Sequence, residues 1–547
     1  MDVFGGVKEY GRDLRREFAG YNASYFQQDL FAGVTVAAVA LPLALAFGVG
    51  SGADGASGLI SAIVSAFVIG ALSGASFQIS GPTGAMSAIL IPLSIKFGMQ
   101  GVLAAGALAG VILLVAGLFR MGKLVYYLPA PVIVGFTSGI ALIIALGQME
   151  NLFGVKSEGA ETLERFWGIF AHGFDPNYFA LAIGLLSIAI ILLWPKKFAA
   201  KFPGSLAAVL ATTLVAFVFR LPVELVGDIP RTLLHESRLT LSGLLSTRLD
   251  IITVPAFSIA ALGMIESLLC GVAGGRMKGE KLNSDRELIA QGIGNILLPF
   301  LGGVPATAAI ARSSVAIKSG GRTRLTGIVQ GVVLLCSMFL LAPVMSRIPL
   351  ASLAGVLMMT AWRMNEWHSI RYIFERKFHW GAAKFLLTML VTVVFDLTIA
   401  IAVGVSFAMV AFVAEMSHLN VTITDVDKDR AENETDRSGR TQVVYVVGPV
   451  FFGSIEPFES GIKRAQAENL VLSMLGVPYV DTSGVQSLFE YCRERIAAGT
   501  GIRFAGVNPK VKKMFDRAGI TDLVGSDAFF VNSIEAIGMA ETKKPKG

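Results

Sequence analysis

Residues 76–95 read SFQISGPTGAMSAILIPLSI, an apolar run of membrane length that Gly81, Pro82 and Gly84 interrupt. Broken backbone cannot face lipid, because each unsatisfied N–H or C=O group costs several kcal/mol in hydrocarbon. The interruption therefore predicts a segment that lines a cavity inside a membrane protein. A helix that starts at about Thr83 presents free N–H groups and the positive end of its dipole, and both attract an anion.

A second interruption lies in the other half of the chain, where GGVPAT at residues 302–307 precedes AAIARSSVAI. Paired interruptions in corresponding positions of two hydrophobic halves are the best sequence pointer to a transporter's binding site. Each interruption carries a threonine close to its proline, Thr83 and Thr307. The alternative interpretation is an ordinary proline kink at each position. The pairing favours an anion site between two helix ends.

The composition is that of a polytopic membrane protein. Of the 547 residues, 54% are hydrophobic and 16% are charged, and the mean hydropathy is +0.65, far above that of a soluble protein. The three cysteines lie far apart, which argues against a disulfide framework or a metal site. No phosphate loop, metal-ligand spacing or nucleophile–base pattern is present, so an enzyme is not expected. The net charge of +6 comes mostly from loop Lys and Arg, which indicates membrane orientation rather than nucleic-acid binding.

The apolar pattern predicts an α-helical polytopic membrane protein with about 14 spans, seven in each half. The predicted spans are roughly 30–50, 58–75, 82–97, 100–119, 125–148, 177–194, 204–220, 254–274, 286–302, 306–317, 325–345, 350–362, 380–395 and 397–416. The third and tenth are the short, interrupted ones. Lys and Arg are enriched in every link that follows an even-numbered span, so both termini are expected in the cytoplasm.

The chain is expected to divide into a membrane part and a soluble part. We predict a transmembrane anion transport domain over residues 1–424, a charged linker over 425–441, a small cytoplasmic α/β domain over 442–540 and a disordered tail over 541–547. Residues 1–29 are polar and aromatic, which predicts an amphipathic cytoplasmic helix at the membrane surface rather than a cleavable signal peptide.

Several motifs, in order along essentially the whole chain, resemble the sulfate permease (SulP) family of anion transporters. They are GVTVAAVALPLALAFGVGSG at 33–52, SGPTGAMS at 80–87, the stretch from Ile265 to Asn283, and GGVPATAAIARSSVAIKSGGRTR at 302–324. The soluble part resembles the family's C-terminal STAS domain. The resemblance implies a 7+7 inverted repeat, core and gate domains, and a homodimer. Within the family, LPLALA at 41–46 and NSDREL at 283–288 look most like cyanobacterial sodium-dependent bicarbonate transporters.

Glu266 is the predicted coupling residue, because an ionisable group within a membrane span is a functional candidate by default. The alternative is a packing pair with a neighbouring helix. The resemblance places Glu266 where an aspartate helps to bind sodium, and it places Cys270 and Ile310 at two further ligand positions. Sodium prefers oxygen ligands, which Cys and Ile side chains do not supply. The coupling ion is therefore expected to be H+ or Na+, with H+ favoured.

The predicted anion ligands lie at the two interruptions. Thr83 and Thr307 have hydroxyl groups that can donate to an anion, although N-capping of a helix is the simpler role for a threonine. Arg312 adds positive charge for an anion. The alternative is a structural role, in which Arg312 pairs with Glu266 or with a backbone carbonyl. Small residues allow backbone amides to reach a ligand, although they also serve close helix packing. These small residues are Gly84, Ala85, Ala308 and Ala309.

In the soluble part, Asp481-Thr482-Ser483-Gly484 looks like the phosphorylatable loop of anti-sigma-factor antagonists, with Ser483 as the candidate acceptor. Simple capping of the following helix is the favoured interpretation. The whole chain is predicted to be a multi-pass protein of the inner (plasma) membrane that needs no cofactor or metal.

The first choice of function is a secondary active transporter of a small inorganic or carboxylate anion, with bicarbonate as the best guess. It is expected to be coupled to a cation and to work by alternating access. The alternatives are a proton-coupled sulfate or dicarboxylate symporter, an anion exchanger or channel-like protein, and a signalling role of the soluble domain with the membrane part as its anchor.

Overall fold

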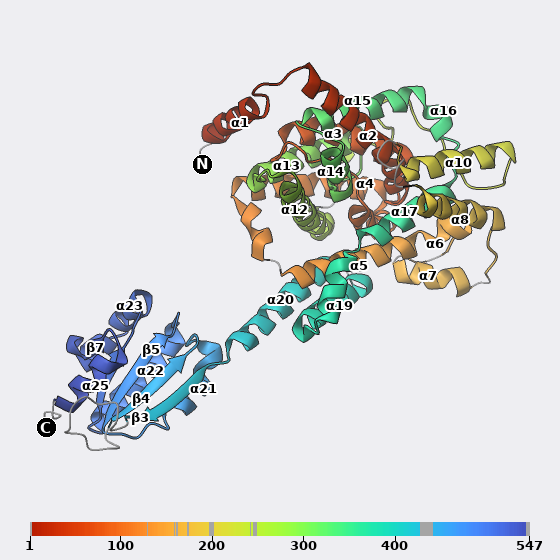
Figure 1. Cartoon of the computed structure of the whole chain (residues 1–547). Helices are drawn as coiled ribbons and strands as arrows, with labels where there is room; N and C mark the ends of the chain where they lie inside the picture. The colour runs from red at the N-terminus through yellow and green to blue at the C-terminus, as the bar shows by residue number, and fades with distance from the viewer. Residues whose placement is uncertain are drawn as a thin grey trace. The chain divides into compact units, whose positions relative to one another are not determined.

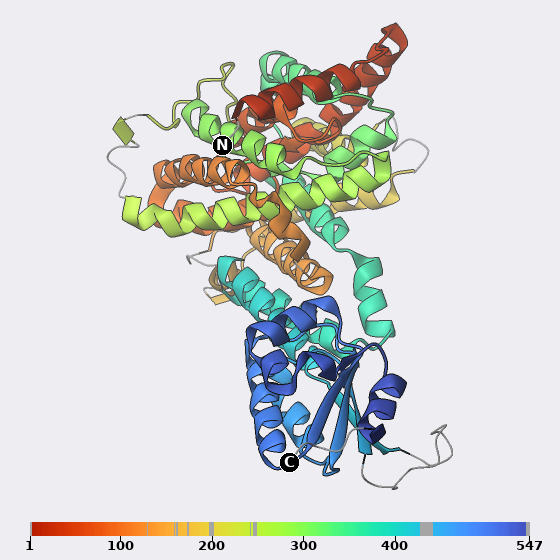
Figure 2. The same cartoon turned by 90° about the vertical axis from the view of Figure 1, so that its left-hand side faces the viewer.

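The computed structural model describes residues 3–542 apart from 128, 158, 160–161, 172–173, 196–201, 241, 244–248, 396 and 427–440. The chain forms two compact units, Met1–Val405 and Ser406–Gly547, which are described separately (Figures 1 and 2). The predicted linker and tail lie almost wholly outside the described residues, as does Asp396. The predicted domain limits therefore stay predictions.

The described part of the first unit is mostly helical. Its first half contains α1 (Val3–Glu17), α2 (Ala23–Val49), α3 (Gly55–Leu72), α4 (Gly84–Leu118), η1 (Met121–Tyr127), α5 (Ala130–Gly147), α6 (Met149–Phe153), α7 (Thr162–Ala171), α8 (Tyr178–Leu193) and α10 (Gly204–Val218). Its second half contains α12 (Leu249–Lys278), α13 (Ser284–Leu301), α14 (Ile310–Lys318), α15 (Leu325–Leu340), α16 (Ala342–Met345), α17 (Leu350–Met364), α18 (Trp367–Glu375), α19 (His379–Val394) and the start of α20 (Leu397–Met416).

Five helices in the described part of the chain are long and apolar enough to cross a membrane. These are Ala23–Val49, Gly55–Leu72, Gly84–Leu118, Ala130–Phe153 and Asp250–Lys278, and shorter apolar helices accompany them. The helix α4 contains the predicted third and fourth spans as two arms, because its backbone leaves helical geometry at Gly98 (φ 67°, ψ 174°). The predicted tenth span begins later than expected, since α14 starts at Ile310 rather than at 306. The total of 14 spans stays a prediction.

The helices of the first unit form two groups (Figure 1). One group packs α2, α3, α4, α12, α13, α14 and α15 together, and the other packs α5, α8, α10, α17 and α19. This grouping agrees with the expected core and gate domains. Within the first group α4 and α13 approach closely at glycine, as small residues allow in membrane helices. A Cβ atom on Gly292 would lie 2.5 Å from the Leu114 nitrogen, so this crossing leaves no room for a side chain.

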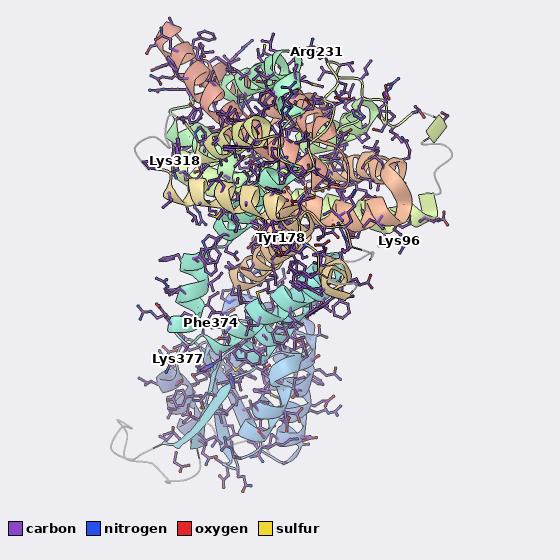
Figure 3. The ribbon with its side chains drawn as sticks, turned by 90° about the vertical axis from the view of Figure 1, so that its right-hand side faces the viewer. Lys96, Tyr178, Arg231, Lys318, Phe374 and Lys377 are labelled. Carbon is purple, nitrogen blue, oxygen red and sulfur yellow. The ribbon has the colours of Figure 1, made fainter. Side chains whose placement is uncertain are left out.

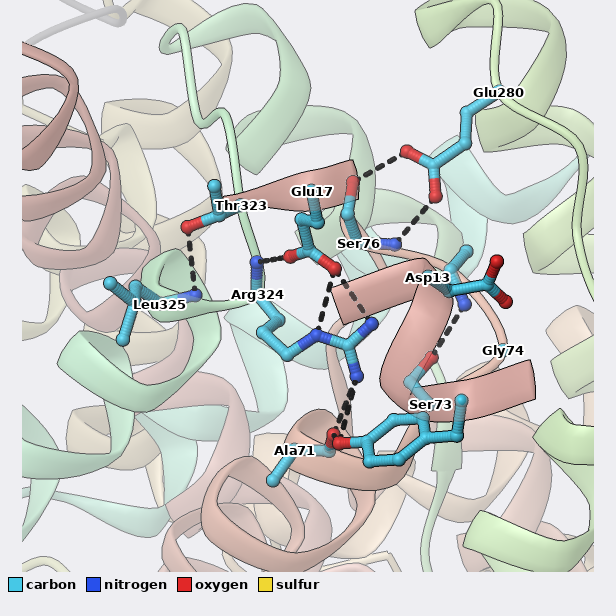
Figure 4. Close-up of polar contacts among 12 residues, drawn as sticks. Asp13, Glu17, Ala71, Ser73, Gly74, Ser76, Glu280, Thr323, Arg324 and Leu325 are labelled. Atoms are coloured by element: carbon cyan, nitrogen blue, oxygen red, sulfur yellow. Dashed lines mark hydrogen bonds and ion pairs between the residues drawn. The ribbon is translucent and has the colours of Figure 1, made fainter. Parts of the chain in front are cut away.

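The amphipathic N-terminal helix predicted from the sequence is α1, and it packs against the ends of three core helices (Figure 4). The Arg324 guanidinium forms a buried ion pair with Glu17 at 2.7 Å and donates to the Ala71 carbonyl. Arg286 pairs with Asp13 at 2.6 Å. Because these partners lie on α1, α3, α13 and α15, the N-terminal helix ties both halves of the first unit together.

The second unit is an α/β domain with a five-stranded sheet of order β3-β4-β5-β6-β7. Its β3 strand runs antiparallel to β4, and the other neighbouring strands are parallel. The strands are β3 (Asn420–Asp425), β4 (Thr441–Val447), β5 (Asn469–Gly476), β6 (Gly501–Ala505) and β7 (Phe529–Phe530). The helices are α21 (Ile455–Ile462), α22 (Thr482–Ala497), α23 (Pro509–Arg517), α24 (Ile520–Val524) and α25 (Ser533–Thr542). The sheet therefore extends upstream of residue 442, where the sequence placed the start of this domain.

The loop that holds Ser483 has the geometry of a helix cap. Asp481 is the N-cap of α22, and its side chain accepts from the Gly484 N–H at 2.7 Å and from the Phe452 N–H at 3.0 Å. Ser483 lies in the first turn of α22 and is partly buried. The capping interpretation therefore accounts for Asp481, and phosphorylation of Ser483 stays a prediction.

Candidate functional site

The two interruptions meet in the folded chain. Two short strands, β1 (Ser80–Gly81) and β2 (Thr307–Ala308), pair antiparallel, with Ser80 opposite Ala308 and Gly81 opposite Thr307. The helix α4 begins directly after β1, and Thr83 caps it by accepting from the Met86 N–H at 3.3 Å. The helix α14 begins directly after β2. The pairing therefore places two helix N-termini, one from each half of the chain, at a single site.

Glu266 on α12 connects the two interruptions. Its Oε2 atom accepts a hydrogen bond from the Thr83 hydroxyl at 2.9 Å and another from the Thr307 hydroxyl at 2.6 Å. The two hydroxyl oxygens are 3.2 Å apart. Each threonine has one hydroxyl proton, so in this conformation both protons are directed to the carboxylate and neither is available to an anion.

Arg312 lies in the first turn of α14 and is 1% exposed. Its Nη2 atom donates to the Pro82 carbonyl at 2.7 Å, which joins α14 to the first interruption. Its Nη1 atom has no hydrogen-bond partner among the described residues, and it lies where a Cβ atom on Gly81 would be only 2.5 Å away. The ion pairs within 4 Å among the described residues do not include one between Arg312 and Glu266. A buried guanidinium with an unused donor is the arrangement that an oxyanion complements.

The other predicted ligands have different surroundings. The Ala308 N–H donates to the Ser267 hydroxyl at 3.2 Å, and the Ala309 N–H donates to the Ile79 carbonyl at 2.9 Å. The free amides near the second interruption are therefore those of the first turn of α14 itself. The Ile310 side chain is 48% exposed, and the buried Cys270 thiol donates to the Ser313 hydroxyl at 3.4 Å.

The N-terminus of α4 borders a small cavity. Gly84 faces α5, since a Cβ atom there would lie 2.5 Å from Ile144 Cδ1, and Ala85 is buried beside it. The cavity has a volume of about 10 Å³, and Phe47, Gly84, Ser87, Ile144 and Gln148 are among its lining residues. This space holds about one water molecule. In this conformation the N-terminus of α4 is therefore nearly closed.

A row of polar residues on α13, which the sequence analysis missed, supports both interruptions. The Asn295 amide donates to the Ala306 carbonyl and accepts from the Ala306 N–H, at 2.9 and 2.8 Å. Gln291 donates to the Ser80 hydroxyl at 2.8 Å, and it also donates to the carboxylate of Glu287. These three α13 residues are spaced four apart, so they share one helix face. The spacing of four residues is the sequence pattern from which this polar face could have been predicted.

Comparison with known proteins defines the class. The profile of the sulfate permease family matches residues 26–378, and the profile of the STAS domain matches residues 433–536. Together with the fold, these matches define a membrane anion transporter with a C-terminal STAS domain. The chain belongs to the sulfate permease family, and its relatives are transporters rather than enzymes.

Two full-length relatives illustrate the family. YvdB of Bacillus subtilis (strain 168), provisionally named a sulfate transporter, is 35% identical over 95% of this chain and 99% of its own length. The bicarbonate transporter BicA of Picosynechococcus sp. (strain ATCC 27264 / PCC 7002 / PR-6) is 29% identical over 93% of this chain and 94% of its own length.

Two solved structures match the fold. The transmembrane domain of a cyanobacterial BicA superimposes with a TM-score of 0.63 at 29% identity, and the match covers 69% of this chain and 98% of that one. The murine anion transporter Slc26a9 in its inward-facing state superimposes with a TM-score of 0.84 at 18% identity, and this match covers 95% and 92% of the two chains. The predicted fold class, a polytopic helical membrane protein with a STAS domain, is confirmed.

Proposed function

We propose that this chain is a secondary active transporter that carries a small inorganic or carboxylate anion through its membrane unit by alternating access. The observation that carries this proposal is the buried Arg312 guanidinium, whose Nη1 atom is unpartnered beside two helix N-termini. The positive ends of the two helix dipoles add to its charge. An anion at this place would supply the missing acceptor and compensate the buried charge.

In the proposed site, the anion contacts Arg312 and the first amides of α4, at Gly84 and Ala85, and of α14. Arg312→Gln keeps hydrogen-bonding capacity but removes the charge, so anion-dependent thermal stabilisation of the full-length protein should be lost. Arg220→Gln, at an exposed turn, is the matched control. Wild-type anion affinity in a folded Arg312→Gln protein would contradict this placement. A bulky residue in place of Thr83 or Ala308 should also abolish binding.

Bicarbonate is the proposed substrate, and sulfate or a dicarboxylate is the alternative. The name of BicA supports bicarbonate, whereas the provisional name of YvdB supports sulfate. Counterflow of labelled bicarbonate, sulfate, fumarate and chloride in proteoliposomes separates these substrates. Exchange of sulfate but not of bicarbonate would reject the first choice.

We propose Glu266 as the coupling residue. A proton is the preferred ion, because Cys270 and Ile310 supply no oxygen ligand. Sodium also has support, since the Glu266 Oε2 atom and the hydroxyls of Thr83 and Thr307 bring three oxygens together. Uptake under a pH gradient without sodium, and then under a sodium gradient at equal pH, identifies the ion. Glu266→Gln should remove the dependence on that ion, and full coupling in this variant would exclude both interpretations.

The proposed setting is the inner (plasma) membrane, with a homodimer whose N-terminus and STAS domain are cytoplasmic. The basic links after even-numbered spans support this orientation. A protease added to sealed, right-side-out cells should leave the segment 427–440 intact. Cleavage there would overturn the orientation without affecting the placement of the anion.

A further inference from the structure

The last turn of α17, the helix α18 and the turn that follows it present a band of aromatic side chains to the outside of the membrane unit. Trp362 is 59% exposed and Trp367 is 45% exposed, and their rings lie 4.5 Å apart. Tyr372, Phe374 and Phe378 are also exposed. Tryptophan and tyrosine gather at the level of lipid headgroups, because each combines an apolar ring with a polar N–H or O–H group.

Basic side chains are interleaved with this band. Arg363, Arg371, Arg376 and Lys377 are all exposed, and the described structure gives this group one ion pair, a 3.8 Å contact between Arg371 and Glu375. Such an exposed pair is weak, so most of the positive charge faces outward. Figure 3 labels Phe374 and Lys377 on α18 and on the turn that follows it.

The backbone at Lys377 has an unusual conformation for a lysine. Its φ of 54° is left-handed, a conformation that glycine usually adopts just after a helix end. Among the described residues, the non-glycine residues with positive φ are Arg120, Arg220 and Lys377, and each directly follows the C-cap of a helix. Favourable interaction with the helix dipole accounts for part of this preference. At Lys377 the strained residue also extends the basic surface of α18.

The lipid-facing side of the unit continues from this surface. The next helix, α19, exposes Leu386, Leu390 and Val394 along its length, as a helix against hydrocarbon does. Aromatic and basic groups therefore lie at the end of an apolar helix face, on the side that the charge bias assigns to the cytoplasm.

We propose that the last turn of α17, the helix α18 and the turn that follows it bind anionic phospholipid headgroups in the cytoplasmic leaflet. The inference rests on the proposed orientation of the chain and goes beyond its transport function. The guanidinium and ammonium groups pair with the headgroup phosphates, while the aromatic rings lie at the boundary with the acyl chains. Continuity with the lipid-facing surface of α19 identifies the occupant as bilayer lipid rather than free phosphate.

The test measures binding of dioleoylphosphatidylglycerol to the full-length protein in detergent by native mass spectrometry, with dioleoylphosphatidylcholine and inorganic phosphate as comparison ligands. Lys377→Gly removes a charge and at the same time relieves the left-handed backbone, so weaker lipid binding in this variant cannot be attributed to misfolding. Arg220→Gly makes the same change at the end of α10, on the opposite side by the same charge bias. We expect Lys377→Gly to weaken phosphatidylglycerol binding about fivefold, and Arg220→Gly to leave it unchanged.

A second measurement locates the bound lipid. Trp362 and Trp367 are exposed on this surface, so brominated phosphatidylglycerol should quench their fluorescence more than brominated phosphatidylcholine in a variant in which the other three tryptophans, Trp167, Trp194 and Trp380, are replaced by phenylalanine. Equal binding of both lipids, equal effects of the two glycine variants, competition by inorganic phosphate alone, or an absence of quenching would each overturn the proposal.

Discussion

Replacement of Asn295 by leucine tests how the second interruption is held. The side chain is 1% exposed and makes two hydrogen bonds to Ala306, which is fully buried just before β2. Leucine has nearly the same shape but leaves the Ala306 N–H and C=O without these partners. Each unsatisfied buried group costs about 1–3 kcal/mol, so Asn295→Leu should lower the free energy of unfolding by roughly 2–6 kcal/mol.

Gln330 on α15 offers a matched control. It is also fully buried, but neither its amide nitrogen nor its amide oxygen has a hydrogen-bond partner among the described residues. Methionine fills the same volume and removes the unpaired polar groups. Gln330→Met should therefore leave stability unchanged or raise it by about 1–3 kcal/mol.

Thermal unfolding of both full-length variants in one detergent, followed by size-exclusion chromatography of the heated samples, measures the difference. Asn295→Leu should unfold several degrees below the wild type and lose stabilisation by the transported anion, whereas Gln330→Met should do neither. Equal destabilisation in both variants would refute the reasoning. In that case the loss of any buried amide, rather than the bonds to Ala306, would set the cost.

Three further predictions concern other parts of the chain. Thr307→Val removes the 2.6 Å hydrogen bond to Glu266, so initial uptake rates under the driving gradient should fall about tenfold or more, and unchanged rates would exclude this contact from coupling. Burial raises the pKa of the Cys492 thiol to about 12, so mass spectrometry should find no alkylation of native protein at pH 8, and STAS unfolding monitored by hydrogen exchange should become easier above about pH 9, where only the unfolded thiol ionises. Gly292→Leu forces a side chain against Leu114, so the free energy of unfolding should fall by about 1–3 kcal/mol, and the melting temperature should fall with it.

The sequence identified the interruptions because glycine, proline and ionisable residues stand out in apolar runs. Thr83 is the N-cap of α4, as its position before the helix suggested, and Glu266 and Arg312 lie at the interruptions. These positions follow from local rules: a helix must be capped, and a charge within a membrane must find polar neighbours.

The contacts within the site were not predictable from the sequence. Whether the Thr307 hydroxyl turns toward an anion or toward Glu266 depends on the register between β1 and β2, which lie more than 200 residues apart in the chain. The 48% exposure of Ile310, the first residue of α14, could not be predicted either, because α14 starts later than its apolar pattern indicates. Asn295 was missed although its spacing of four from Gln291 and Glu287 marks a polar face on α13, because that spacing does not reveal the Ala306 backbone as its partner.

The pairing of β1 with β2 limits how access to the site can change. Each strand belongs to a different half of the chain, and backbone hydrogen bonds as well as Glu266 hold the two helix ends together. The N-termini of α4 and α14 cannot separate to release a ligand without breaking the buried hydrogen bonds between β1 and β2. Under the proposed alternating access, the group formed by α2, α3, α4, α12, α13, α14 and α15 would therefore move as one body past the group formed by α5, α8, α10, α17 and α19.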